Sequence, residues 1–383
     1  MIQATPARNV LAGICCLAAL MGVGRLAFTL ILPSMMSDLG LSPADAGFIA
    51  SSNLVGYLLG AMLASSRIFT GIERGVLITV LALNVVLTGS MALDGSLLFL
   101  SINRFVGGMV SAMGMIFVTA VVSAKLVESK RPELLVHQFT GVGFGIVISS
   151  LACAGVLAAG GGWRVCWLVC GALALVGLIL AVVFLEKGAP VRARGDHEPP
   201  LPRSKPLRNI IAAYGLFGFG YIITTTFLIA IVRDNGDAPR MEAIVWIITG
   251  LAVLPSTYLW GKLARKIGLP LTYAAGCFVE AIGVMAAVLV TGASGPLLGA
   301  LLLGGTFVAT TALGIQYSRN LAPNSPRKVL ATMTTLLSVT QIFGPIVAGI
   351  IAARSGGYLI ASSIAAIILV ASGLCVVRDR PTS

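Results

Sequence analysis

The chain is a succession of apolar runs, each about 20 residues long, separated by short polar spacers. An α-helix rises ~1.5 Å per residue, so one such run crosses the ~30 Å hydrocarbon core of a bilayer. Only 10% of the residues are charged, against roughly 25% in soluble domains, which excludes a soluble globule. Because a chain in hydrocarbon must satisfy its own backbone groups, these runs predict an all-α, multi-pass membrane protein.

Twelve spans can be placed along the chain, and one long spacer divides them into two groups of six. The spacer "EKGAPVRARGDHEPPLPRSKPL", residues 186–207, is too rich in charge and proline to cross a membrane. We therefore predict a six-helix bundle at 1–185, a linker at 186–207 and a second six-helix bundle at 208–383. An even division is typical of two parallel halves related by an axis along the membrane normal. The predicted spans are 9–37, 43–65, 74–93, 97–124, 134–159, 163–185, 208–232, 241–262, 270–290, 294–318, 328–352 and 356–377.

Lysine and arginine are distributed unevenly between alternate loops, which predicts the orientation of the chain. One side carries "KLVESKR" at 125–131, the linker, "GKLARK" at 261–266 and basic residues of both termini. The other side carries only Arg164, Arg233, Arg240 and Arg354. We expect both termini and the linker in the cytoplasm, and the protein in the inner membrane of a bacterium. The formal net charge of +12 follows from this loop bias and gives no reason to expect a nucleic-acid partner.

Several motifs resemble those of major facilitator superfamily transporters. "RFVGG", which begins at Arg104 in the fourth span, is similar to the superfamily's arginine motif. "GKLARKIG" is similar to its loop motif, with Arg265 where an aspartate is usual. "GVGRLAFTLILPSMMSDLGLS", "NLVGYLLGA", "GVGFGI", "YGLFGFGYIITTTFL" and "QIFGPIVAG" resemble the YbfB/YjiJ family of bacterial transporters and extend from the first span to the eleventh. The resemblance implies the major facilitator fold, in two pseudo-symmetric six-helix bundles, and transport by alternating access, without a particular substrate.

Arg25 lies deep in the first span, "GICCLAALMGVGRLAFTLILPSMM". It is roughly fifteen residues from the start, or ~20 Å along the axis, which is too deep for its side chain to reach water easily. A charge at that depth costs at least ~2.5 kcal/mol on insertion scales, so a compensating partner is expected. Either the guanidinium is structural and bonded to neighbouring helices, or it lines a cavity that receives an anion. Arg104 lies about seven residues into the fourth span, and the resemblance implies that both helices line one cavity.

Carboxylates within the spans are too few to neutralise these arginines. Only Glu280, in the ninth span, lies inside an apolar run, and the first half has none. The missing counter-charge of Arg25 is therefore predicted to belong to the substrate, as a carboxylate, phosphate or sulfate, because the planar guanidinium fork suits such groups. Arg104 is then a second cation or part of a coupling network.

Two titratable residues are candidates for proton coupling. Glu280 is an acid inside a span, and such residues often bind and release protons. Its alternative role is that of a neutral acid at a helix interface. His137, near the cytoplasmic start of the fifth span, titrates near neutral pH, and its alternative role is a solvated or capping group.

Polar and aromatic side chains on several spans are candidates for lining a ligand pocket. Asn53 and Tyr57 are one helical turn apart on the second span and therefore share a face. The others are Tyr221, Thr224 and Thr225 on the seventh span, Trp246 on the eighth, Thr310 on the tenth and Gln341 on the eleventh. Aromatic rings beside hydrogen-bonding groups are typical of small-molecule sites, although each residue alone also suits contacts between helices.

Glycine and proline mark two places where helices approach closely or bend. Gly141 and Gly145 have the G-x-x-x-G spacing that allows close helix packing. Gly344 and Pro345 interrupt the eleventh span and should weaken its helix locally. We predict gating or hinge roles for both pairs.

The sequence thus predicts a secondary transporter that moves a small organic anion or zwitterion across the inner membrane by alternating access, most simply coupled to protons. Uniport and anion exchange are the options that need no proton site. Efflux of cationic or neutral amphiphiles, with Glu280 as the recognising acid, is an alternative. A membrane-embedded sensor or assembly partner without transport is a second alternative. We find no metal spacing among the cysteines and no nucleotide motif. We therefore expect no enzyme activity, metal or cofactor. We expect a monomer in the lipid bilayer.

Overall fold

The computed structural model describes residues 6–185, 199–234 and 239–378, and these residues form helices joined by short turns. Twelve helical segments among them are long and apolar enough to cross a membrane. They are Pro6–Leu39, Pro43–Ala64, Glu73–Ser90, Leu97–Glu128, Leu134–Ala158, Trp163–Phe184, Lys205–Arg233, Met241–Ile267, Leu269–Leu289, Ser294–Leu321, Lys328–Ser355 and Leu359–Val376. The predicted twelve-span, all-helical architecture is confirmed. Residues 186–198 of the predicted linker lie outside the described residues.

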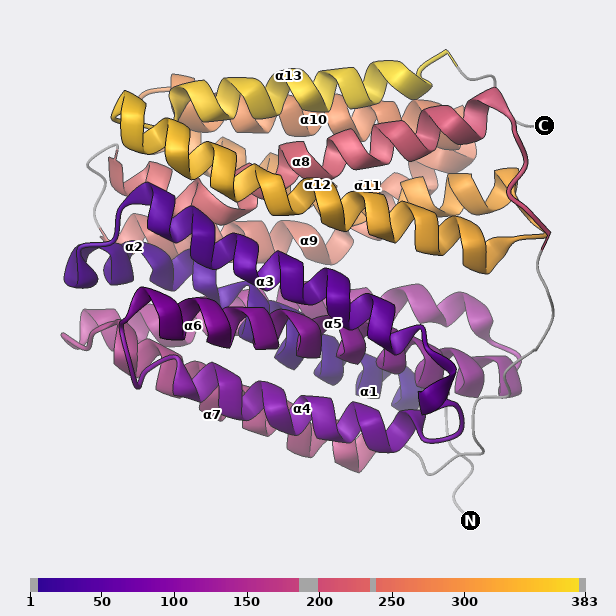
Figure 1. The fold of residues 1–383 in the computed structure, drawn as a ribbon, viewed down its shortest axis with the longest axis horizontal. Coiled ribbons are helices and arrows are strands. Elements are labelled where there is room, and N and C mark those ends of the chain that lie inside the picture. Colours follow the sequence, from indigo (N-terminus) through magenta and orange to yellow (C-terminus); the bar gives the residue numbers. More distant parts are fainter. Residues whose placement is uncertain (1–5, 186–198, 235–238, 379–383) are drawn as a thin grey trace. The chain divides into compact units, whose positions relative to one another are not determined.

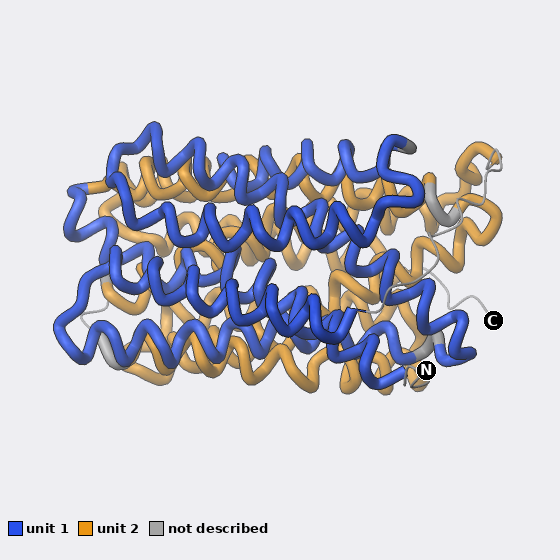
Figure 2. The backbone as a smooth tube through the Cα atoms, turned by 90° about the horizontal axis from the view of Figure 1, so that it is seen from below, with its two compact units in different colours: residues 1–40, 52–194 blue, residues 41–51, 195–383 orange. Residues whose placement is uncertain are grey.

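The chain forms two compact units, which Figure 2 shows in different colours. Unit 1 contains residues 1–40 and 52–194, and unit 2 contains residues 41–51 and 195–383. The division after residue 194 falls within the segment predicted as a linker. Residues 41–51, which the sequence pattern places in the first bundle, belong to unit 2. Gly47 and Gly349 explain this placement, because a glycine at each position lets the backbone of 41–51 meet that of α12 (Pro326–Ser355).

Unit 1 is built around the first span and its neighbours (Figure 1). Its elements are α1 (Pro6–Leu17), η1 (Ala18–Arg25), α2 (Ala27–Leu39), most of α3 (Pro43–Ala64), η2 (Arg67–Phe69), α4 (Glu73–Ser90), α5 (Leu97–Glu128), η3 (Pro132–Phe139), α6 (Thr140–Ala158) and α7 (Trp163–Phe184). Helix α4 packs against both α5 and α7, and α6 packs against η1. Leu83, Val86 and Ile102 are exposed, as expected for side chains that face hydrocarbon rather than water.

Six complete helices among the described residues belong to unit 2, together with the first residues of α3, and its core lies between α8, α10 and α11. The helices are α8 (Lys205–Asp234), α9 (Pro239–Ile267), α10 (Leu269–Leu289), α11 (Ser294–Leu321), α12 (Pro326–Ser355) and α13 (Leu359–Val376). Helix α10 packs between α11 and α13, and α8 packs against α12 and α13 (Figure 1). Tyr214, Phe217 and Tyr273 are fully buried there, and the ring of Phe217 meets that of Tyr273 edge-on at 6.1 Å.

Gly141 and Gly145 bring α6 against the first span, as their spacing predicts for a helix contact. A side chain at Gly145 would meet the Ala18 carbonyl and, at 2.7 Å, the Cα of Gly22. A side chain at Gly141 would meet the carbonyl of Ile14. Only glycine therefore allows these backbones to approach so closely. This packing contact does not test the predicted gating role of Gly141 and Gly145, which stays a prediction.

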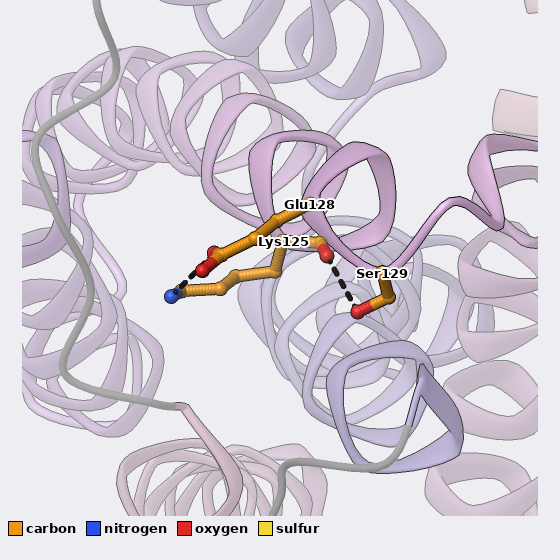
Figure 3. Close-up of polar contacts among 3 residues, drawn as sticks. All are labelled: Lys125, Glu128 and Ser129. Atoms are coloured by element: carbon orange, nitrogen blue, oxygen red, sulfur yellow. Dashed lines mark hydrogen bonds and ion pairs between the residues drawn. The ribbon is translucent and has the colours of Figure 1, made fainter.

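Polar side chains form contacts near the ends of several helices. Arg164 Nη1 donates to the carbonyls of Ala92 and Leu93, at 2.6 and 3.1 Å, just beyond the C-terminus of α4. At the C-terminus of α5, Lys125 forms an ion pair of 3.0 Å with Glu128 (Figure 3). These contacts satisfy groups that the helices themselves leave unbonded or charged at their ends.

Candidate functional site

The first span changes its hydrogen-bond register immediately before its charged residue. The segment η1 (Ala18–Arg25) is π-helical and separates α1 from α2. Leu26 N donates to Met21 O at 2.9 Å, an i→i+5 bond in place of the usual i→i+4 bond. Short π-helical segments occur frequently at functional sites. The sequence does not indicate the π-helical segment η1, because a π turn differs from an α turn in its hydrogen-bond register and not in residue type.

Side chains from two other helices bond to the main-chain carbonyls of η1. Asn84 Nδ2, on α4, donates to Ala19 O at 3.1 Å. Arg104, on α5, donates from Nη1 to Gly24 O and from Nη2 to Arg25 O, both at 3.2 Å. These bonds hold the wide turn, because an unsatisfied carbonyl in hydrocarbon is costly. Asn84 was not among the predicted site residues, although an amide in the middle of the third span was a signal for it.

Arg104 is buried and uses its guanidinium on the protein itself. Its side chain is 6% exposed, and its Cζ lies 4.6 Å from the centre of the Phe28 ring. Asn53 Nδ2, on α3, donates to the main-chain carbonyl of Arg104 at 2.8 Å. Asn53 and Arg104 therefore form one network that supports the end of η1. The sequence predicted both as substrate ligands and did not indicate that their donors would bond to carbonyls.

Arg25 lies at the end of η1 with its guanidinium over an aromatic ring. Its Cζ is 4.4 Å from the centre of the Tyr57 ring, a cation–π contact. The Tyr57 hydroxyl donates to Met115 Sδ at 3.1 Å, and a thioether is a weak acceptor. Arg25 is half-buried, and no carboxylate of the described residues forms an ion pair with it. The structure thus brings together Arg25, Tyr57, Arg104 and Asn53 from three separate spans.

The two guanidinium groups create a strongly positive region inside unit 1. Arg104 bonds to the main-chain carbonyl of Arg25, and no carboxylate of the described residues forms an ion pair with either guanidinium. Like charges in a medium of low polarity repel strongly. An anion that reached this region would be attracted by both charges, and its most accessible contact would be Arg25.

Unit 2 holds a second group of predicted residues, around Tyr221 on α8. Gln341 Nε2, on α12, donates to the Tyr221 hydroxyl. The Tyr221 ring stacks with Phe217 at 4.9 Å and with Phe307 at 6.0 Å. The two stacking contacts hold the Tyr221 ring in place. The hydroxyl of Tyr221 and the amide of Gln341 are the polar groups of this cluster.

Three other predicted residues of unit 2 carry buried polar atoms that have no hydrogen-bond partner in the described part of the chain. They are Thr224 Oγ1, Trp246 Nε1 and Thr310 Oγ1. The hydroxyl of Thr225, in contrast, bonds to the carbonyls of Tyr221 and Ile222 on its own helix, at 3.0 and 3.1 Å. Unpartnered buried groups are uncommon and often mark sites of function or bound water.

The remaining predicted residues lie in different surroundings. Glu280, on α10, is fully buried, and its Oε2 is 3.0 Å from Thr306 Oγ1 on α11. His137, in η3, is exposed, and its Nδ1 is 3.3 Å from the carbonyl of Leu134. Pro345 lies inside α12, and a side chain at Gly344 would meet Ile222 on α8.

Comparison with known proteins identifies the relatives of the chain. The family model described as "Uncharacterised MFS-type transporter YbfB" matches residues 17–377. No curated protein matches the chain.

Solved structures with the same fold cover almost the whole chain. The nucleoside transporter NupG has a TM-score of 0.71 at 14% identity, covering 97% of this chain and 100% of that one. A bacterial homolog of the human lysosomal transporter Spinster, in an inward-facing and occupied conformation, has a TM-score of 0.63 at 13% identity, covering 96% and 94%. At such identities the likeness establishes the fold alone.

Proposed function

The chain belongs to the YbfB family of MFS-type secondary transporters, and we propose that it carries a small organic anion or zwitterion whose anionic group binds Arg25. One observation carries the proposal. Arg25 is half-buried within a membrane span and has no carboxylate partner among the described residues. A guanidinium in hydrocarbon requires a counter-charge, and an anionic substrate supplies it.

The surroundings of Arg25 favour a planar oxyanion such as a carboxylate. Its guanidinium offers a fork of N–H donors that matches the two oxygens of such a group. The Tyr57 hydroxyl now donates to a weak acceptor, Met115 Sδ, and gains energy by donating to an anionic oxygen instead. Arg104 is a positioning residue in this account, because two of its donors are bonded to the carbonyls of Gly24 and Arg25.

Other predicted residues complete the proposal with less direct support. Asn53 holds the main chain of Arg104 and so acts through it. Within unit 2, taken by itself, the proposed ligand-binding residues are Tyr221, Thr224, Thr225, Trp246, Thr310 and Gln341. The unpartnered polar atoms of Thr224, Trp246 and Thr310 support this proposal, because a bound ligand can satisfy such atoms.

The proposed cycle is alternating access in the bacterial inner membrane, with both termini in the cytoplasm as the lysine and arginine bias favours. A proton gradient is the proposed energy source, with Glu280 or His137 as the proton carrier. Gly141, Gly145, Gly344 and Pro345 are the proposed sites of bending or sliding. The alternative of cation efflux has less support, because the acid it requires, Glu280, is fully buried.

Counterflow in proteoliposomes tests the proposal. The purified chain is reconstituted with an internal pool of one compound from a panel of monocarboxylates, dicarboxylates, amino acids, organic phosphates and amphiphilic cations. Entry of the labelled compound is then measured for the wild type and for Arg25→Ala. We expect exchange of at least one anion or zwitterion by the wild type and its loss in Arg25→Ala. Exchange of cations alone, or anion exchange that survives in the variant, would contradict the proposal.

A further inference from the structure

Glu280 is the one carboxylate, among the described residues, that lies in the middle of a span rather than near a helix end or in a loop. It is fully buried on α10. None of the charged residues on the helices packed against α10, namely α8, α9, α11 and α13, bonds to it in the described chain. The titratable groups near it are Cys277 and Tyr273, one and two turns earlier on α10, and both are close to Ser372 Oγ on α13. The carboxyl group therefore has no cation to stabilise a negative charge.

Thr306 is the hydrogen-bond partner of the Glu280 carboxyl group among the described residues. Thr306 Oγ1 lies 2.6 Å from Leu302 O, one turn back on α11, and 3.0 Å from Glu280 Oε2. A hydroxyl group has one hydrogen to donate, and a main-chain carbonyl can only accept. An ionised Glu280 shares that single hydrogen with Leu302 O, because Thr306 Oγ1 is then the only donor for both contacts. A protonated Glu280 brings a second hydrogen and can donate to Thr306 Oγ1 while Thr306 donates to Leu302 O, so the two contacts favour the protonated acid.

The cost of burying charge leads to the same protonation state. An ionised carboxylate without a cation in a buried site is strongly disfavoured and becomes neutral by binding a proton. The neutral acid needs one acceptor for its O–H group and fewer hydrogen-bond donors than the ion, which can only accept. Oε1, which has no hydrogen-bond partner in the described chain, is tolerable as the carbonyl oxygen of a neutral acid and costly as part of an anion.

Two threonine hydroxyls lie along the seam between α10 and α11 where they are able to respond to loss of this proton. Thr310, one turn beyond Thr306, fills the space that Gly276, one turn before Glu280, leaves open. Its Oγ1 is fully buried and has no hydrogen-bond partner in the described residues. Because hydroxyl hydrogens rotate freely, Thr306 can redirect its hydrogen from Leu302 O to Oε2, and Thr310 has an uncommitted hydrogen. In this seam Thr306 Oγ1 therefore serves as an acceptor for the acid and as a donor for the anion.

We propose that Glu280 is the proton-binding site of this transporter, with the proton on Oε2 and donated to Thr306 Oγ1. The proposal rests on the proposed function in one respect, which is that transport is coupled to protons. The bound proton joins α10 to α11, and its release leaves an anion to which Thr306 Oγ1 can donate.

Infrared spectroscopy of the full-length protein in lipid tests the protonation state directly. The difference spectrum between the wild type and Glu280→Gln at neutral pH should contain the carbonyl band of a protonated carboxylic acid. Glu128→Gln is the matched control, because Glu128 is 72% exposed at the end of α5 and its removal should leave the band in place. Absence of the band from the wild type would overturn the proposal. The measurement is independent of the substrate, so it also holds if the anion proposal fails.

Transport measurements test the coupling. Glutamine preserves the shape and neutrality of the protonated acid but cannot release a proton. In proteoliposomes with an imposed proton gradient, Glu280→Gln should still exchange substrate in counterflow, while accumulation falls to an inside-to-outside ratio near one. Accumulation equal to that of the wild type would place the proton elsewhere and overturn the proposal. Loss of exchange in the wild type itself would count against the proposed function instead.

Discussion

Arg104 donates a hydrogen bond from Nη2 to the main-chain carbonyl of Arg25 at 3.2 Å, so one intramembrane arginine holds the backbone that carries the other. A second bond, from Nη1 to Gly24 O, makes this contact a fork across the end of the π-helical segment η1. The two arginine side chains therefore have different surroundings. Arg104 uses its donors on the protein, and we propose that Arg25 uses its donors on a ligand.

Arg104→Lys should lower the stability of the protein and weaken its response to anions. An ammonium group carries the same charge but lacks the planar fork, so it cannot span both carbonyls. Loss of one hydrogen bond from a charged group costs about 2 kcal/mol. Thermal unfolding in detergent measures this loss. A variant as stable as the wild type would show that the fork does not hold η1.

Tyr57→Phe should separate the two contributions of Tyr57. The ring remains under Arg25, so the cation–π contact and the fold are kept, whereas the hydroxyl that would bond to an anion is lost. We expect anion affinity to fall about tenfold, the equivalent of ~1.4 kcal/mol, which is typical of one hydrogen bond to a charged group. Ligand titration by tryptophan fluorescence or calorimetry measures the change. Unaltered affinity would exclude the hydroxyl from the site.

Gly145→Ala should disturb the contact between α6 and η1. The added Cβ would meet the backbone of Ala18 and Gly22, and such overpacking typically costs about 1–3 kcal/mol. Gly155→Ala, on the same helix, is the control, since nothing lies within 4 Å of its Cβ position; helix propensity predicts no loss there. Equal unfolding temperatures for the two variants would show that α6 and η1 are too loosely packed to require glycine.

Glu242→Gln should destabilise unit 2 without changing the response to anions. Arg233 donates to both carboxylate oxygens of Glu242, at 2.6 and 2.9 Å, and Glu242 is 2% exposed. Because Arg233 is about one-third exposed, we expect a loss of roughly 1–3 kcal/mol, less than for a fully buried pair. The pair Lys125–Glu128, whose carboxylate is 72% exposed, is the comparison, and Lys125→Gln should cost under about 1 kcal/mol. A similar loss in both variants, measured by thermal unfolding, would contradict this ranking.

The spans and the fold followed from the sequence because the physical constraint is local. Any segment that crosses hydrocarbon must be apolar, helical and about 20 residues long, and each of these properties is visible in a short window. Arg25 and Tyr57 were both predicted to line one site, because charged and strongly polar side chains inside spans usually face the interior of a bundle. The contact between Arg25 and Tyr57 does not test ligand binding, so their role in binding stays a prediction.

The parts that sequence reasoning missed depend on contacts between distant segments. The π-helical register of η1 is supported by Asn84 and Arg104, which lie on other helices. Whether Arg104 faces a ligand or a carbonyl depends on how α5 packs against the first span, and the residue type is the same in both cases. Residues 41–51 belong to unit 2 because Gly47 lets their backbone approach that of Pro345, a contact between segments far apart in the sequence.

Thermal stabilisation of the purified protein by ligands tests the central claim most directly. Carboxylates, amino acids, organic phosphates and amphiphilic cations are compared on the wild type, on Arg25→Ala and on Arg354→Ala, which removes an exposed arginine at the end of α12. We predict that at least one anion or zwitterion raises the unfolding temperature of the wild type and of Arg354→Ala and has no effect on Arg25→Ala. An anion response that persists in Arg25→Ala, or stabilisation by cations alone, would contradict the assignment of Arg25 as the anion-binding residue.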